Sequence, residues 1–211
     1  MSRYIVTAFF LFLSLILFAI TYQPGALINV YIPNLITEIW GVAITILIID
    51  YLQERRSRRD LFESLKRDLL AKDQGIALRA INELRNYGWL TDGSLRGLQA
   101  RYAVFDRAEL KGAILDEADF YRASLQRAYV GHASLRNANF RKADLRRAIF
   151  NHSDLRGADF TDANLENTSF EDANLQGAVL SRYQIKTAKS FERAIMPNGR
   201  IFEVWVQDKN L

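Results

Sequence analysis

The most regular feature of the chain is a five-residue pattern of small, polar and large apolar positions from Ala103 to Arg182. Sixteen units follow one another without an insertion, as in ADLRR, AIFNH and ANLQG. The first position is Ala except at Ser153 and Thr168, and the third is always Leu, Phe or Val. A repeat this short and this strict is typical of a solenoid, in which each unit packs against its neighbours.

The odd length of the unit determines the shape of the predicted coil. In extended backbone the first and third residues point the same way, so the small and the large side chain face inward together. Because five is odd, the chain must turn a corner in every unit to keep all pairs inside. Twenty residues per coil place like side chains in columns, whereas fifteen mix Leu with Phe. The clearest columns are Leu115, Leu135, Leu155 and Leu175, and Phe120, Phe140 and Phe160. The pattern therefore predicts a four-sided coil with a filled core.

Two apolar segments precede the repeats and indicate membrane spans. Tyr4 to Ile20 has no charged residue and as a helix extends about 26 Å, close to the hydrocarbon thickness of a bilayer. The second segment, Ile32 to Leu52, carries Glu38 and Asp50 near its ends, a placement more typical of wetted helix ends than of an ion site. We therefore expect a transmembrane hairpin over residues 1–53.

The positions of Lys and Arg predict the orientation of this hairpin. The loop from Thr21 to Leu35 has none, whereas Glu54 to Asp60 contains four arginines directly after the second span. Both termini and the repeats are then expected in the cytoplasm. A cleaved signal peptide is the alternative for the first segment, and it leaves the rest of the chain on the same side.

Residues 54–92 are predicted to form a basic juxtamembrane segment and an amphipathic helical connector. Asp60 and Glu63 fit a capping box at its start. Its two apolar stripes are Leu61, Phe62, Leu65 and Leu69, and Ala77, Ala80, Ile81 and Leu84. We expect this helix, which ends near residues 86–88, to cover the first coil together with Trp89 and Leu90, because the open end of a β-helix exposes unpaired backbone.

Residues 183–211 are predicted to cap the other end. Pro197 to Gly199 is a turn signal between Ile195 and the apolar run 201–206, which we expect to fold back over the last coil. Trp205 is then part of this lid rather than a ligand contact. A homodimer interface at this end is the alternative.

The A(D/N)LXX pattern of ADLRR, ANLQG and ADFTD resembles that of the pentapeptide-repeat proteins. The resemblance covers residues 103–182 and reaches residue 93, where GSLRG fits the register before Ala100 interrupts it. It implies a right-handed, four-sided β-helix over residues 93–182, and hence an all-β repeat solenoid preceded by a two-helix transmembrane hairpin and a helical connector. The hairpin and connector resemble membrane-anchored bacterial members, which implies an integral protein of a bacterial inner or thylakoid membrane.

The composition leaves little for catalysis or metal binding. The chain has no cysteine and two histidines, which excludes disulfides, thiol nucleophiles and thiolate metal sites. His132, His152 and Asp172 share the fifth position of units one coil apart, and two imidazoles with a carboxylate can ligate zinc or nickel. Because solvent-facing positions supply no supporting shell, we predict no metal and no cofactor, with this column as the one candidate.

Charge is unevenly distributed along the repeats. Ala123 to Lys142 holds four basic and no acidic residues, although the sixteen units together hold 11 basic and 12 acidic ones. We call this coil and its flanking cations the basic waist, which consists of Arg122, Arg127, Arg136, Arg141, Lys142, Arg146 and Arg147. The planar guanidinium group suits carboxylates and phosphates, so an acidic partner surface or anionic headgroups are expected there. The alternative is a solvated face.

A filled coil offers flat walls, so we do not expect an enzyme. We expect a membrane-anchored, non-enzymatic scaffold that contacts the lipid bilayer and presents a rigid rod to a protein partner, such as a membrane complex. The alternatives are a topoisomerase-binding DNA mimic, as in the quinolone-protection members of the resembled family, and a metal- or anion-binding regulatory module. Mimicry requires a strongly acidic surface, and the acids at second positions are expected to be occupied in the corners. Nucleic acid is not the expected partner, because few aromatic residues accompany the arginines.

Overall fold

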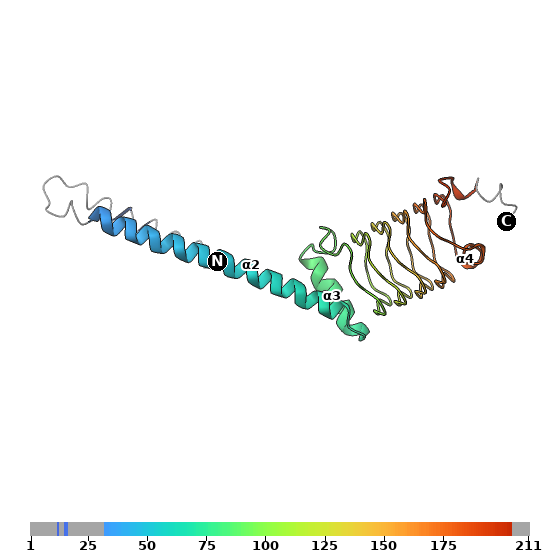
Figure 1. Ribbon diagram of the computed structural model, residues 1–211, viewed down its shortest axis with the longest axis horizontal. Coiled ribbons are helices and arrows are strands. Elements are labelled where there is room, and N and C mark those ends of the chain that lie inside the picture. The colour runs from blue at the N-terminus through green and yellow to red at the C-terminus, as the bar shows by residue number, and fades with distance from the viewer. Residues whose placement is uncertain (1–11, 13–14, 17–31, 204–211) are drawn as a thin grey trace. The chain divides into compact units, whose positions relative to one another are not determined.

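The computed structural model describes residues 12, 15–16 and 32–203 of the chain, which divides into the units Met1–Leu61 and Phe62–Leu211. Three helices are described: α2 (Ile32–Leu69), α3 (Gln74–Asn86) and α4 (Arg182–Thr187). Between α3 and α4 the chain winds through the stacked coils shown in Figure 1. Most of the first predicted span and residues 204–211, which include Trp205, lie outside the described residues.

The predicted localisation as a two-span integral membrane protein is wrong. Among the described residues, no helix is both long enough and apolar enough to cross a membrane. In α2 the uncharged run from Ile39 to Ile49 lies between Glu38 and Asp50 and is about 16 Å long, roughly half of a bilayer's hydrocarbon thickness. The transmembrane hairpin of the predicted fold class therefore has no support.

The capping box predicted at Asp60 and Glu63 does not form, because α2 continues without a break from Ile32 to Leu69. The helix that was expected to end near residues 86–88 is α3. It begins at the N-cap Asp73, whose side chain accepts a hydrogen bond from the backbone N–H of Ile76 at 3.0 Å. Its buried residues are the predicted stripe of Ala77, Ala80, Ile81 and Leu84, which confirms the amphipathic pattern.

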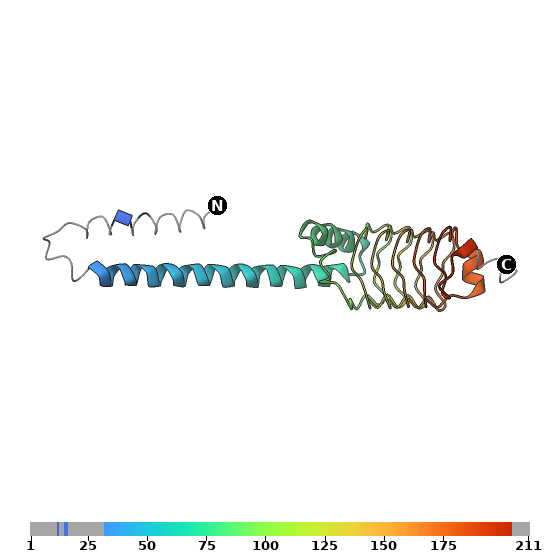
Figure 2. The same ribbon diagram turned by 90° about the horizontal axis from the view of Figure 1, so that it is seen from above.

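α3 and the segment after it cover the first coil, as expected (Figure 2). The side chain of Gln74 donates to the carbonyl of Asp106 at 2.7 Å. Leu90 is buried, and its carbonyl accepts the backbone N–H of Ile114 at 2.8 Å. Trp89 packs edge-on against Phe62, with ring centroids 5.2 Å apart. The carbonyl of Asp106 and the backbone N–H of Ile114, which would be exposed at the open end, are therefore paired.

Parallel bridges join residues that are twenty positions apart. One coil therefore contains four five-residue units and has four sides. One such column runs from Val104 through Ser124 and Asp144 to Asn164. On each described side only one residue forms a β-bridge to the neighbouring coil. The coils are therefore joined by isolated bridges and not by extended strands. This confirms twenty residues per coil.

The core consists of the predicted columns. The ring of Phe140 stacks on those of Phe120 and Phe160 at centroid distances of 5.0 and 5.1 Å. Neighbouring columns meet edge to face, as Phe140 and Phe150 do at 5.7 Å. The Leu column is buried throughout, and first-position alanines allow adjacent sides to approach.

The two exceptions at the first position are accommodated by hydrogen bonds inside the core. The hydroxyl of Ser153 donates to the carbonyl of Val130 at 2.7 Å, and that of Thr168 donates to the carbonyl of Leu145 at 2.8 Å. Both acceptors belong to the preceding coil. The side chain that replaces the usual alanine methyl group therefore carries a buried hydroxyl that is not left unpaired.

The solenoid extends further at both ends than the strict pattern indicates. Leu98 occupies a first position and Ala100 a third, so the large and small residues are exchanged but the register is not interrupted.

After α4, Ser190 bridges Ser169 and Ile195 bridges Asn174, an offset of twenty-one. The predicted turn at residues 197–199 is confirmed by an antiparallel bridge between Ile195 and Ile201. Phe202 then stacks on Phe191 at 5.5 Å and covers the end of the core.

Each corner requires a left-handed residue. The backbone N–H of Ala108 donates to the carbonyl of Phe105 at 3.0 Å and closes a turn whose third residue, Arg107, has a φ of 59°. Every fifth position from Gly97 to Gly177 has a positive φ of this kind. The corners therefore disfavour β-branched residues at this position and accept Gly, Asn and Asp.

This backbone geometry makes a prediction for Arg147, which has a φ of 60° and an exposed side chain. We expect Arg147→Val to lower the free energy of unfolding by about 1 kcal/mol, because a β-branched residue is strained in this conformation. Arg147→Asn should be nearly neutral, since Asn137 and Asn167 occupy the same turn position. Urea unfolding curves measure the difference, and equal midpoints for the two variants would contradict it.

Candidate functional site: the corners of the β-helix

The second position of the unit holds the corners together. Its Asp or Asn side chain accepts the backbone N–H of the fourth residue, as Asp159 does from Thr161 at 2.8 Å and Asn164 from Glu166 at 3.0 Å. The same contact is made by Asp119 to Tyr121, Asp144 to Arg146 and Asp154 to Arg156. The expectation that these second-position acids are occupied in corners is confirmed. They are not free to form an acidic binding surface.

Asp154 is the most heavily engaged of these carboxylates. Arg156 donates to it from Nε at 2.8 Å and from a terminal nitrogen at 2.7 Å, and Arg136 donates from Nε at 2.6 Å. The hydrogen bonds from Arg156, with a further contribution from Arg136, outweigh partial burial and lower the pKa of Asp154 to about 2. This carboxylate therefore stays ionised down to low pH.

The basic waist is divided among three of the four corners. Arg127 lies beside Arg146 and Arg147, since its backbone N–H donates to the carbonyl of Arg146 at 2.9 Å. Arg122 lies beside Arg141 and Lys142, with a corresponding hydrogen bond to the Arg141 carbonyl at 3.0 Å. Arg136 occupies a third corner. The seven cations therefore encircle the coil instead of sharing one surface.

Three of the waist arginines are paired with second-position carboxylates. The nitrogen-to-oxygen distances are 2.6 Å from Arg136 to Asp154, 3.5 Å from Arg141 to Asp159 and 2.7 Å from Arg146 to Asp144. Within residues 32–203, Arg127, Lys142 and Arg147 form no ion pair and are exposed. These fifth-position cations have most of their charge available to a partner.

The histidine column exists, but its geometry serves side-chain packing. The rings of His132 and His152 stack at 4.8 Å with 10° between their planes. Nδ1 of His152 lies 3.7 Å from Asp172, whose carboxylate accepts two hydrogen bonds from Arg193 at 2.7 and 2.8 Å. These bonds lower the pKa of Asp172. In the described part of the chain, no three His, Asp or Glu side chains are arranged to hold a metal ion.

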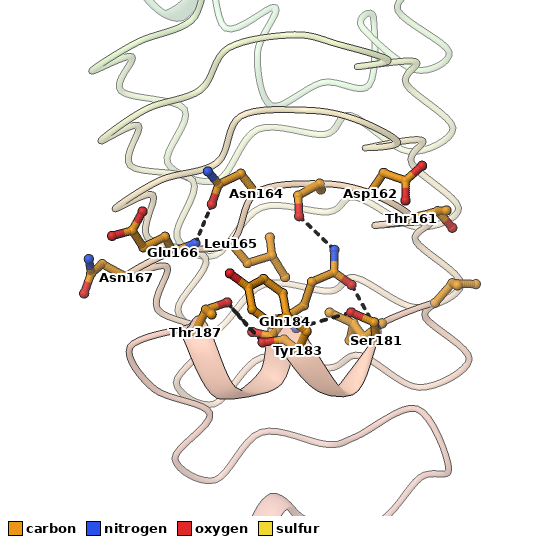
Figure 3. A pocket seen from close by; sticks show the side chains of 13 residues that line it. Thr161, Asp162, Asn164, Leu165, Glu166, Asn167, Ser181, Tyr183, Gln184 and Thr187 are labelled. Atoms are coloured by element: carbon orange, nitrogen blue, oxygen red, sulfur yellow. Dashed lines mark hydrogen bonds between the residues drawn. The ribbon is translucent and has the colours of Figure 1, made fainter.

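A groove of about 1040 Å³ lies where α4 replaces one side of the coil (Figure 3). Asp162, Glu166 and Tyr183 line it, and the buried side chain of Gln184 forms part of its floor. The Gln184 amide donates to the carbonyls of Phe160 and Ala163 at 2.6 and 2.9 Å, so it completes the pairing of the last full coil. Gln184 is therefore a structural residue.

Comparison with protein-family models identifies the repeat that forms the coils. Residues 94–127, 123–162 and 158–182 match the model of the pentapeptide repeats, with eight copies. This region is a pentapeptide-repeat domain. The fold of such domains is a right-handed β-helix solenoid, and proteins of this family are generally non-enzymatic structural or interaction proteins.

Solved pentapeptide-repeat proteins resemble parts of this chain. Rfr23 from the cyanobacterium Cyanothece 51142 is 28% identical over 39% of this chain and 57% of its own, with a TM-score of 0.39. A pentapeptide repeat protein from Nostoc Pcc 7120 is also 28% identical, over 48% of this chain and 77% of its own, with a TM-score of 0.40. HetL, involved in heterocyst differentiation regulation in Nostoc sp. strain PCC 7120, is 27% identical over 51% and 61%, with a TM-score of 0.32. The chain thus spans little more than half of Rfr23, and no curated protein matches it.

One corner of the pentapeptide-repeat domain contains residues that the sequence analysis did not group with the waist. We call it the Tyr–Arg corner, and its members are Arg101, Tyr102, Tyr121, Arg122, Arg141 and Lys142. The twenty-residue period was sufficient to find it, because these are the fourth and fifth positions of three successive coils. The charge count followed the chain along each coil, but the residues that form one surface come from successive coils.

Proposed function

We propose that the pentapeptide-repeat domain is a non-enzymatic scaffold that binds a protein partner through its corners. The observation that carries this proposal is the fixed display of exposed cations, since fifth-position side chains project from turns whose backbone is hydrogen-bonded to the neighbouring coil. Such turns hold side chains at a regular spacing of about 4.8 Å along the axis, so little backbone ordering is required on binding.

The topoisomerase-binding mimic receives less support from the same contacts. Asp119, Asp144, Asp154 and Asp159 each accept a corner N–H, and three of them also pair with waist arginines. A surface whose acids are occupied in this way lacks the field that imitates DNA.

The test is affinity purification of the full-length chain, followed by direct binding measurements between the purified chain and each recovered protein. We expect one protein to bind the wild type and to be lost from the variant Arg122→Gln/Arg127→Gln/Lys142→Gln/Arg147→Gln. These four residues are exposed and form no ion pair in the described part of the chain, so the melting temperature should not change. Failure to recover a direct binder would overturn the scaffold, and a topoisomerase would support the mimic.

A further inference from the structure

The Tyr–Arg corner differs from the other three corners in both charge and residue type. Its fourth and fifth positions over three coils are all Arg, Lys or Tyr, with no acid among them. Over the same three coils the corner of Arg127 and Arg147 includes Asp106 and has no aromatic residue, and the next coil adds one acid to each corner, Asp162 to the Tyr–Arg corner and Glu166 to the other. Among the fourth and fifth positions of the described coils, tyrosine and cations are therefore combined at this corner alone.

Contacts between coils make these six residues one continuous surface. The rings of Tyr102 and Tyr121 meet edge to face at 5.9 Å, and the backbone N–H of Tyr102 donates to the carbonyl of Tyr121 at 3.0 Å. The guanidinium carbons of Arg101 and Arg122 lie 4.7 and 5.5 Å from the centre of the Tyr121 ring. These contacts hold two arginines on one ring and restrict their rotamers before any partner arrives.

The corner retains positive charge after its internal pairs are counted. Arg101 lies 3.7 Å from Asp119, and Arg141 lies 3.5 Å from Asp159. Arg122 and Lys142 form no ion pair within residues 32–203. Four cations and the carboxylates of Asp119 and Asp159 leave a net charge of +2 on these three coils, or +1 when Asp162 in the next coil is included, beside the ring of Tyr102, which is 52% exposed.

We propose that the Tyr–Arg corner is the partner-binding surface of the scaffold and that it takes an acidic protein segment. This inference rests on the proposed function and names the surface and the chemistry of the partner. Tyr and Arg are the residue types that dominate binding at protein interfaces, because each combines an apolar body with a polar end. Carboxylates of the partner complement the unpaired cations of Arg122 and Lys142, and a partner side chain packs on Tyr102. A polyanion recognised by charge alone does not require the tyrosines.

The experiment uses the full-length chain and a fluorescein-labelled polyglutamate peptide, with oligothymidylate as the competing probe, at physiological salt. We expect Arg122→Gln/Lys142→Gln to raise the Kd for polyglutamate about tenfold. The matched control is Arg127→Gln/Arg147→Gln, which removes two exposed, unpaired cations from fifth positions that are likewise twenty residues apart but lie in the next corner along the chain. This control should change the Kd by less than about threefold, because charges beyond a Debye length of about 8 Å are screened.

A second variant tests the aromatic contribution. Tyr102 has a φ of 62°, so Tyr102→Asn keeps a residue suited to the turn while it removes the ring. For a glutamate and tyrosine copolymer we expect this variant to raise the Kd about fivefold, and to do so at high salt as well as at low salt, since lost packing is not screened. The melting temperatures of all variants should match the wild type.

Several outcomes would overturn the inference. Equal losses in the two double variants would assign binding to overall charge, no binding of polyglutamate would exclude an acidic segment, and tighter binding of oligothymidylate would indicate nucleic acid instead. An unchanged Kd in Tyr102→Asn would show that the Tyr102 ring does not contribute to binding. Binding that depends on the Arg127 corner would contradict this inference but not the proposed scaffold function. That function would be overturned if affinity purification recovered no direct binder.

Discussion

Phe140→Asp should destabilise the pentapeptide-repeat domain by several kcal/mol, because it places a carboxylate inside a column with no partner. Phe140 is fully buried and stacks between Phe120 and Phe160 at 5.0 and 5.1 Å. Urea unfolding at neutral pH measures the loss. If the variant does not fold, Phe140→Leu provides the measurable change, since Leu180 follows Phe160 in the same column, and it should lose about 1 kcal/mol.

The matched control is Lys142→Asp, which places the same side chain two residues away at an exposed corner. Lys142 has a φ of 59°, and Asp162 and Asp172 occupy the same position in other units. The expected loss is within about 0.5 kcal/mol, as for most surface substitutions. Comparable losses for Phe140→Asp and Lys142→Asp would mean that the assignment of inward and outward positions is wrong.

Acid should weaken the domain in part through Asp154. Its folded-state pKa of about 2 lies below the ordinary aspartate value of 3.8. A lowered folded-state pKa stabilises the fold above the unfolded pKa, and this contribution is lost as pH falls through the folded value. Because solvent screens this exposed pairing, Asp154 should contribute about 1 kcal/mol at neutral pH, most of it lost between about pH 4 and pH 2.

Asp154→Asn isolates this contribution, because Asn at the second position still accepts the corner N–H, as Asn164 does at 3.0 Å. We expect the variant to be less stable than the wild type by about 1 kcal/mol at pH 7 and the difference to shrink towards pH 2. Asp162→Asn, at an exposed corner, controls for the change in net charge. A stability difference that stays constant from pH 7 to pH 2 would contradict the assigned role of Arg156 and Arg136.

The ends of the solenoid show where a strict pattern ceases to be informative. Leu98 and Ala100 exchange the usual small and large positions, which preserves volume in the core but breaks the sequence motif. At the other end α4 inserts one extra residue into the coil, so Ser190 bridges Ser169 across twenty-one positions. A fixed twenty-residue period does not predict this offset, because it is the packing of residues 190–195 against the preceding coil that aligns them with it.

The membrane prediction failed for a related reason. Apolar residues between Ile39 and Ile49 are a real feature, but they belong to a helix that continues into the charged segment ending at Leu69. Hydropathy describes a window of residues, whereas crossing a bilayer requires an uninterrupted apolar length of about 30 Å. Whether a helix can cross a membrane therefore depends both on its length and on where its charged residues lie.

The candidate surface was predicted in composition but not in arrangement. Counting along the coil from Ala123 to Lys142 found the cations, but it grouped Arg127 with Arg136, which lie in different corners. It also omitted Arg101 and Tyr102, which lie one and two coils away from the other members of the Tyr–Arg corner. Residues twenty positions apart are neighbours in this fold, so a surface has to be found across coils.

The sequence by itself determined the period, the inward columns and the four-sided coil, because every unit repeats the same local choice of a small and a large apolar residue. It also indicated that Asp119, Asp144, Asp154 and Asp159 serve the corners, since their distance to the turn is local. Only the tertiary structure decided which cations are neutralised, because Arg136 and Arg141 reach acids eighteen residues away in the next coil. For the same reason it alone decided that Tyr121 carries two arginines and that Arg122 and Lys142 remain available, since these contacts depend on how one coil is stacked on another.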